Sequence, residues 1–524
     1  MKKGAVAGSL VTAAGIISIL TLSSRVVGFA RWFAQSAWVG TGEFANAYAS
    51  ANQIPNVAYE VAVGGALAGM TIPLISAPLA RGRRDEADRV ASVLATWALL
   101  ILVPLAAIVW LAAPAIAAAL PAPAGSDAAA QVSLISTFLR IFSVQIPLYG
   151  LCAVLTGVLQ SHERFFWPAL TPLLSSLGVI ATYAAFGALA RGGVNVGTVS
   201  EGAVAVLGWG TTLGVALLSL PLLIPVCRLG VRLRPAWRLN AEEARRALGL
   251  GTAGIVGLVA QQICVLVVLW VARRYGGPGT LPVYQYSQAV YLLPYAIGAV
   301  PVATAMFPRL NRTVNDSRAF ADATSRSSGL IVVLGLAGAA LVAVEAEPAQ
   351  GVFGLINPVP GMREGLIAMS CGLAGYALIY HLTRVLYALN RARAVIWATS
   401  AAWLATALLS LVFAALSEGR VSREIATMTS LGTAQSIGML LGAAGLAFAV
   451  HRAAPGALAG TVRIGGLSAL AAVCAVLAVW GSRAFLDLTL TGLWGVFADG
   501  LLAAFIVCAA FAPLLVRHVR RAPL

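Results

Sequence analysis

The sequence predicts an all-α polytopic membrane protein, and three observations carry this prediction. Of the 524 residues, 60% are hydrophobic and only 10% are charged, whereas soluble proteins carry about 25% charged residues. Apolar runs recur from end to end, many of them near the roughly 20 residues that a membrane-spanning helix needs. The longest polar segments, 227–248 and 309–328, are too short to form a soluble domain with its own core.

Fourteen spans are expected along the chain. The first two are too long for a simple crossing and contain helix-breaking residues, Gly28 in the first and Pro55, which we expect to split the second. Such breaks are tolerated where the freed backbone is buried in protein or lines water. The expected spans are 7–37, 45–79, 91–119, 131–159, 166–190, 201–226, 249–273, 282–308, 328–346, 365–389, 394–416, 427–450, 464–482 and 492–516.

The net charge of +16 does not indicate nucleic-acid binding, because the basic residues are spread over short loops between spans. Placing the N-terminus in the cytoplasm puts most of the 35 Lys and Arg residues on the cytoplasmic side, as the positive-inside rule requires. Both termini are therefore expected in the cytoplasm. The apolar run after Lys2 and Lys3 is expected to be the first span and not a cleaved signal peptide. Residues 237–248 are expected to form a short interfacial helix, with Arg238, Arg245 and Arg246 toward lipid phosphates.

Several classes of site are not expected. The six cysteines are scattered singly, with no CxxC pair, so we predict neither a disulfide framework nor a metal site. The phosphate-binding pattern GxxxxGK[ST] is absent, so the chain is not expected to hydrolyse ATP. No cofactor is expected, and coupling to a proton or sodium gradient stays open. Glu345, Glu347 and Glu364 of the expected outer loops form no paired-acid motif, which argues against an enzyme.

Arg25 and Arg31 are the strongest candidates for substrate binding. They lie within the apolar first span, where a charge costs at least about 2.5–3.5 kcal/mol. Six residues on a helix turn through about 600°, so the two side chains point roughly 120° apart, and Gly28 between them permits a bend toward one cavity. Guanidinium groups suit phosphate geometry. The alternative is that both extend to the cytoplasmic interface as topology anchors.

A polar stripe marks the second span. Asn52, Asn56 and Glu60 recur every four residues, so they share one helix face, and Tyr59 lies beside them. Glu60 could pair with Arg25 or Arg31 in an empty cavity, or it could form a static ion pair that only joins two helices. With Gly28 and Pro55, Gly64 and Gly65 are the expected hinges.

Polar side chains also follow one face of the eighth and tenth spans. Tyr284 and Gln288 belong to the former, and Tyr380 and Arg384 to the latter. They are expected to form an amphipathic cavity wall, although tyrosine stripes also occur at membrane interfaces and in packing. Residues 149–160 (YGLCAVLTGVLQ) are similar to 380–391 (YHLTRVLYALNR), six spans apart, which predicts two halves of the same orientation.

Residues 24–31 (SRVVGFAR), the IPN at 54–56 followed by GGAL and TIPL, and residues 165–176 (FFWPALTPLLSS) resemble the MurJ/MviN family. The resemblance extends to VYQYSQA at 283–289 and covers nearly the whole chain. It implies the exporter-superfamily fold of two six-helix lobes plus two C-terminal helices. It also implies a lipid II flippase of the bacterial cytoplasmic membrane, whose substrate is undecaprenyl pyrophosphate carrying the peptidoglycan disaccharide-pentapeptide. The chain departs from the family at Tyr59–Glu60 and Ser287–Gln288, where charged pairs are usual.

The expected organisation is an N-terminal lobe (1–226), a cytoplasmic linker with the interfacial helix (227–248), a C-terminal lobe (249–450), and the last two spans with a basic tail (451–524). The leading hypothesis is a lipid II flippase that works by alternating access. The alternatives are an exporter of another amphiphile or lipid-linked glycan, and a transport-inactive scaffold for cell-wall synthesis or division proteins.

Overall fold

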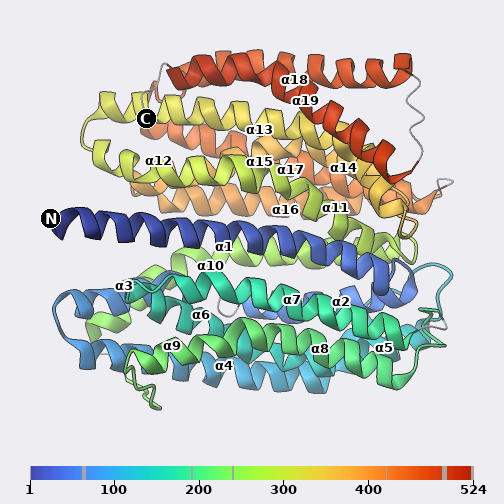
Figure 1. The fold of residues 1–524 in the computed structure, drawn as a ribbon, viewed down its shortest axis with the longest axis horizontal. Helices are drawn as coiled ribbons and strands as arrows, with labels where there is room; N and C mark the ends of the chain where they lie inside the picture. Colours follow the sequence, from blue (N-terminus) through green and yellow to red (C-terminus); the bar gives the residue numbers. More distant parts are fainter. Residues whose placement is uncertain are drawn as a thin grey trace. The chain divides into compact units, whose positions relative to one another are not determined.

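The computed structural model describes residues 2–61, 67–190, 193–238, 241–419, 422–486 and 492–520, and these residues are helical apart from turns and short loops, with no strand among them (Figure 1). The chain divides into two compact units. Unit 1 comprises Met1–Ala122 and Ser126–Gln262, and unit 2 comprises Pro123–Gly125 and Ile263–Leu524. The boundary between them falls within one long helix, α10 (Ala241–Arg274).

Unit 1 is a bundle in which α1 packs on α7, α2 on α5, and α4 on both α5 and α6. Asp127 caps one of its helices by accepting hydrogen bonds from the Ala129 and Ala130 N–H groups, which satisfies two otherwise unpaired donors. Its helices are α1 (Lys2–Trp38), α2 (Glu43–Tyr59), α3 (Leu67–Ala80), α4 (Arg84–Ala119), α5 (Ala128–Ser143), α6 (Gln145–Ser161), α7 (Phe166–Leu189), α8 (Glu201–Ser219), η2 (Leu220–Leu222), α9 (Leu223–Arg228) and the first part of α10.

Unit 2 is built in the same way, and its last two helices, α18 and α19, pack on α13 (Figure 1). Asp316 caps the long α13 through the Arg318 and Ala319 N–H groups. The unit contains the second part of α10, α11 (Thr280–Pro294), η3 (Tyr295–Ala299), α12 (Val300–Thr313), α13 (Ser317–Gly354), α14 (Met362–Ser370), α15 (Gly372–Ala388), α16 (Ala392–Leu416), α17 (Arg423–Ala453), α18 (Ala459–Leu486) and α19 (Leu493–Arg520).

The helices are long and apolar enough for a multi-pass membrane protein. Among the described residues, eleven segments pass the test of length and composition, or twelve if the bent pair α14–α15 is one span. A count of fourteen requires α1 and the pair α2–α3 in addition, and it stays a prediction. The all-helical fold class is confirmed.

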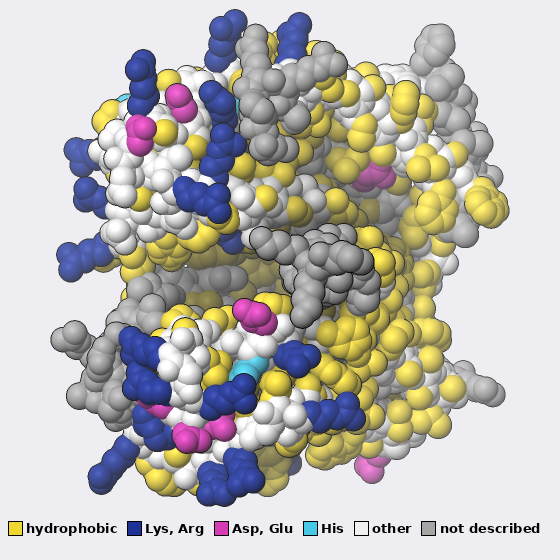
Figure 2. Space-filling model, turned by 60° about the vertical axis from the view of Figure 1, so that its left-hand side comes forward, with side chains coloured by type: hydrophobic (Ala, Val, Ile, Leu, Met, Phe, Trp, Pro, Cys, Tyr) yellow, Lys and Arg dark blue, Asp and Glu magenta, His cyan; other side chains and the backbone are white. Residues whose placement is uncertain are grey.

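Charge is distributed unevenly along the helices of each unit. Figure 2 shows dark-blue Lys and Arg side chains gathered at the helix ends that face the viewer, while yellow apolar side chains cover the helix flanks. The loops after α3 and α9, rich in arginine, belong to the basic end of unit 1. Such an arrangement keeps the charges in water or among headgroups and the apolar flanks in lipid.

Both units contain a span that is broken near its middle. In unit 1 the break separates α5 from α6 at Val144. Pro147 follows three residues later, and its missing N–H cannot bond back to the Ser143 carbonyl. In unit 2 the break separates α14 from α15 at Cys371, with a bend of 48°. After each span comes a non-glycine residue with positive φ, Glu163 at 58° and Asn390 at 56°. The two units thus share a local geometry at the segments whose sequences are similar.

Three sequence-based expectations differ from the structure. Helix α2 continues through Pro55 to Tyr59, so Pro55 does not split the second span, because a proline removes one backbone bond without ending a well-packed helix. The residues at 241–248, expected to lie in a separate interfacial helix, are the first turns of α10, since nothing in their sequence ends that helix. Helix α13 extends to Gly354, so Glu345 and Glu347 lie in a helix rather than an outer loop.

Candidate functional site

In unit 1, α1 carries both candidate arginines and runs unbroken through Gly28. A Cβ atom built on Gly28 would lie 3.9 Å from the Ser176 Oγ of α7, so this face of α1 is turned toward α7. Arg25 and Arg31 are each three residues from Gly28, which places them about 60° to either side of that face. Arg25 is exposed and Arg31 is half-buried.

Arg31 lies over the interior of unit 1. Its guanidinium is 5.5 Å from the centre of the Trp32 ring, and its charge is within electrostatic reach of the hydroxyls of Tyr48 and Tyr149. In the described part of the chain, neither Arg31 nor Arg25 forms an ion pair with a carboxylate. The pairing with Glu60 that the sequence suggested is therefore not present in this structure.

Helix α2 places its polar stripe as expected from the helical period. Asn52, Asn56 and Glu60 are all half-buried, and the Asn56 side chain donates a hydrogen bond of 2.9 Å to the Asn52 carbonyl oxygen. The Tyr59 ring packs against the ring of Tyr149 in α6, with centroids 5.0 Å apart. The candidate hinges Gly64 and Gly65 lie outside the described residues.

In unit 2, a hydrogen-bonded group joins α11 to α17. The Tyr284 hydroxyl donates to the Gln435 Oε1 atom at 3.1 Å. The Gln288 amide donates to the Tyr284 oxygen at 2.6 Å and also to Gln435. Neutral hydrogen bonds of this kind contribute about 0.5–1.5 kcal/mol each. Tyr284 and Gln288 are half-buried and Gln435 is buried.

Arg384 is held against its own helix. Its Nη1 atom donates to the Tyr380 carbonyl oxygen at 2.9 Å, and its guanidinium lies 3.6 Å from the centre of the Tyr380 ring. Tyr295 of η3 packs edge-on against Tyr380 and Tyr376, with centroids 5.6 Å and 4.8 Å away. The faces of the eighth and tenth spans thus meet at Tyr295. Tyr284 and Gln288 bond to α17 instead.

Gln435 and Tyr149 are partners of candidate residues that the sequence alone does not identify. Gln435 was visible as an uncharged polar residue inside an apolar span, but helical spacing alone cannot say which neighbouring helix it faces. The structure has Arg483 in α18, where its Nη2 atom is 2.8 Å from Asp499 Oδ2 of α19.

Each unit therefore carries candidate cations of its own within the spans, Arg25 and Arg31 on unit 1 and Arg384 on unit 2. Over the ranges that the structure describes, none of them has a carboxylate partner. A guanidinium in an apolar span is stabilised when it meets an anion or water, and its fork geometry matches phosphate oxygens. Among the described residues, no group of three or more His, Cys, Asp and Glu side chains could hold a metal ion.

Comparison with known proteins identifies the family. The family model described as lipid II flippase MurJ matches residues 35–497. A probable lipid II flippase MurJ of Rhizobium meliloti (strain 1021) is 28% identical over 350 residues, which cover 65% of this chain and 62% of that relative. The lipid II flippase MurJ of Burkholderia cenocepacia is 26% identical over 353 residues, covering 66% and 63%. The matched region thus spans less than two thirds of the length of these relatives.

Solved structures show the same fold. A lipid II flippase MurJ in an inward closed conformation superposes with a TM-score of 0.74 at 20% identity, covering 95% of this chain and 99% of that one. An inward-facing multidrug resistance MATE family transporter of the MOP superfamily superposes with a TM-score of 0.65 at 16% identity, covering 86% and 98%. Because the family model matches most of the sequence, the chain belongs to the MurJ lipid II flippase family.

Proposed function

We propose that this protein moves lipid II, the undecaprenyl-pyrophosphate-linked precursor of peptidoglycan, from the inner to the outer leaflet of the bacterial cytoplasmic membrane. The two units alternate access to the substrate, and both termini lie in the cytoplasm. The chain acts as a transporter and performs no covalent chemistry. Family membership supports this activity, and the fold likeness to transporters supports the alternating motion.

The observation that carries the proposal is the set of span cations without carboxylate partners among the described residues, on both units. A pyrophosphate offers several oxygens, each able to accept a charge-assisted hydrogen bond. On unit 1 the proposed contact to this group is Arg31, with Arg25 at the more exposed position, and on unit 2 it is Arg384. In this proposal Asn52, Asn56, Gln288 and Tyr284 meet the hydroxyl and amide groups of the sugar-peptide head.

The test is to replace the essential flippase of a bacterium with this chain and to measure growth after depletion of the native protein. Rescue is expected from the unaltered chain and loss of rescue from Arg31→Ala, with membrane levels of both proteins measured. If the unaltered chain is inserted in the membrane but does not support growth, the proposed activity is wrong and the scaffold hypothesis gains. If Arg31→Ala rescues equally well, the assignment of Arg31 is wrong while the activity stands.

A further inference from the structure

An extended segment in unit 1 lies along the outer side of α4. After α9, residues 231–238 have no helical structure and bond to side chains of α4. The backbone N–H of Arg234 donates to Ser92 Oγ at 3.2 Å, and that of Ala236 donates to Thr96 Oγ1 at 3.2 Å. The Trp97 indole donates to the Trp237 carbonyl at 3.2 Å. Side chains of α4 thus hold the backbone of the segment in place through hydrogen bonds.

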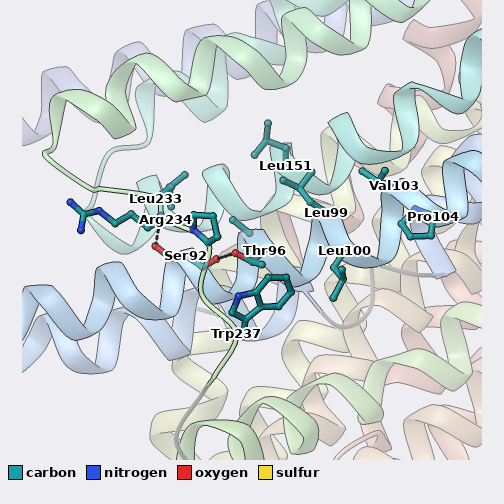
Figure 3. Close-up of a pocket in the computed structure, with 12 residues that line it drawn as sticks. Ser92, Thr96, Leu99, Leu100, Val103, Pro104, Leu151, Leu233, Arg234 and Trp237 are labelled. Atoms are coloured by element: carbon teal, nitrogen blue, oxygen red, sulfur yellow. Dashed lines mark hydrogen bonds between the residues drawn. The ribbon is translucent and has the colours of Figure 1, made fainter.

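The fixed segment, α4 and α6 border an open cavity of about 600 Å³. In Figure 3 the cavity is bounded by Trp237 and Leu100 on one side and by Leu151 on the other, and Arg234 extends away from it at one end. Most of the lining is aliphatic. The lining hydroxyls of Ser92 and Thr96 already accept bonds from the segment. The lining residues are Ser92, Ala95, Thr96, Leu99, Leu100, Val103, Pro104, Leu151, Leu233, Arg234, Pro235 and Trp237.

The cavity has the length of one membrane leaflet. It follows α4 from Ser92 to Pro104, and twelve residues of helix at about 1.5 Å each span roughly 18 Å. Half of a hydrocarbon core of about 30 Å is roughly 15 Å. Three aliphatic lining side chains of α4 are also open to the surroundings, Leu99, Leu100 and Val103, at 40%, 55% and 51% exposure. A lipid chain that lies beside α4 can therefore enter the cavity from the side.

The end of the cavity near Arg234 is strongly basic. Residues 227–238 include Arg228, Arg232, Arg234 and Arg238 and no acidic residue, while Asp88 of α4 accepts a backbone hydrogen bond from Arg232 at the same end. The Arg89 side chain of α4 also lies here and donates to the Arg238 carbonyl at 2.9 Å. Trp237, 59% exposed, is a residue type enriched where the hydrocarbon meets the headgroups. An apolar trough thus ends in a cationic rim at the expected depth of lipid phosphates.

We propose that this cavity is a binding site for one anionic phospholipid of the bilayer, separate from the transported substrate. One acyl chain occupies the trough along α4, between Leu99, Val103 and Leu151, and the phosphate lies at Arg234. The lipid joins α4 and α6 to the segment that follows α9. The charge of the rim favours an anionic headgroup over a zwitterionic one.

The experiment uses the full-length protein in nanodiscs of phosphatidylcholine that contain a fixed fraction of phosphatidylglycerol. A photo-reactive benzoylphenylalanine is placed at Leu100, and mass spectrometry identifies the lipid that becomes attached after illumination. We expect phosphatidylglycerol to be enriched about fivefold over its share of the nanodisc, since one basic side chain near an anionic surface gives an effect of that order. Arg234→Gln should remove most of this enrichment.

Two further variants separate the parts of the proposal. Arg81→Gln, an exposed arginine outside the lining, is the matched control for charge and should leave the enrichment unchanged. Val103→Trp fills the trough and should lower attachment of both lipids. Equal attachment of the two lipids in the unaltered protein, or the same enrichment in Arg234→Gln, overturns the proposal. Displacement of the attached phospholipid by added lipid II also overturns it, because the site would then belong to the substrate.

Discussion

The broken spans of the two units reach a similar geometry by different means. In unit 1, α5 and α6 meet at Val144, and Pro147 supplies a local cause. In unit 2, no proline lies at the break between α14 and α15. Instead the Gly372 N–H donates to Ser436 Oγ of α17 at 2.9 Å, and that hydroxyl donates to the Ala368 carbonyl at 2.6 Å. A side chain from another helix has thus replaced a backbone bond, which is a known cause of helix bends.

The arginines within the spans also differ between the units, in how firmly each guanidinium is held. Arg384 of unit 2 is fixed by its stacking on Tyr380 at 3.6 Å and by a bond to its own helix. Arg31 of unit 1 lies 5.5 Å from its aromatic neighbour, with no ion pair among the residues described. Unit 2 therefore presents a preorganised cation and unit 1 a freer one.

The largest effect is expected from removing either cation. Arg31→Ala and Arg384→Ala should each lower the rate of lipid II flipping in proteoliposomes by about 10- to 100-fold, because a charge-assisted hydrogen bond contributes about 1.5–3 kcal/mol. Arg312→Ala, an exposed arginine at the end of α12, is the control and should flip at the normal rate. An unchanged flipping rate for both Arg31→Ala and Arg384→Ala would show that neither arginine contributes to transport.

A smaller effect is expected from Arg384→Lys. Lysine keeps the charge but loses the planar fork that stacks on Tyr380, so flipping should fall by less than in Arg384→Ala. Arg31→Lys should be tolerated better than Arg384→Lys, because Arg31 has the looser contact. The same flipping assay checks both variants, and the reverse order would contradict the assignment of the preorganised cation to unit 2.

Ser436→Ala should destabilise the protein, since it leaves the buried Gly372 N–H without its partner. The expected cost is about 1–3 kcal/mol, measured as a lower thermal midpoint in detergent. Thr429→Ala removes a hydroxyl that bonds within its own helix, to the Ile425 carbonyl, and should change the midpoint less. Pro147→Ala in unit 1 should cost little, because alanine restores the missing N–H. Equal losses for Ser436→Ala and Thr429→Ala would mean that Ser436 does not hold the bend.

The smallest change in stability is expected from Gly28→Ala. The added Cβ would lie 3.9 Å from Ser176 Oγ, which is an ordinary contact. The free energy of unfolding should therefore change by no more than about 0.5 kcal/mol, and the thermal midpoint should shift little. If Gly28 is a hinge, flipping should slow although stability is kept. A normal flipping rate would remove Gly28 from the proposed hinges.

The sequence was sufficient for the fold class and for the polar face of α2, because both depend on local properties. Apolar runs predict spans, and a spacing of four places Asn52, Asn56 and Glu60 on one face. It was insufficient where helices distant in sequence meet. The bond from Tyr284 to Gln435 and the bend held by Ser436 depend on which helices pack together. Pro55 was misjudged because the packing of α2 outweighs the loss of one backbone bond.

The most direct test of the central claim, that the span cations of both units bind the pyrophosphate of the substrate, is the affinity of the purified protein for lipid II. Native mass spectrometry of the unaltered protein, Arg31→Ala and Arg384→Ala would give this affinity, with undecaprenyl alcohol as the uncharged comparison lipid. The account predicts at least about tenfold weaker binding of lipid II by each variant and unchanged binding of the alcohol. Equal affinity of all three proteins for lipid II would contradict it.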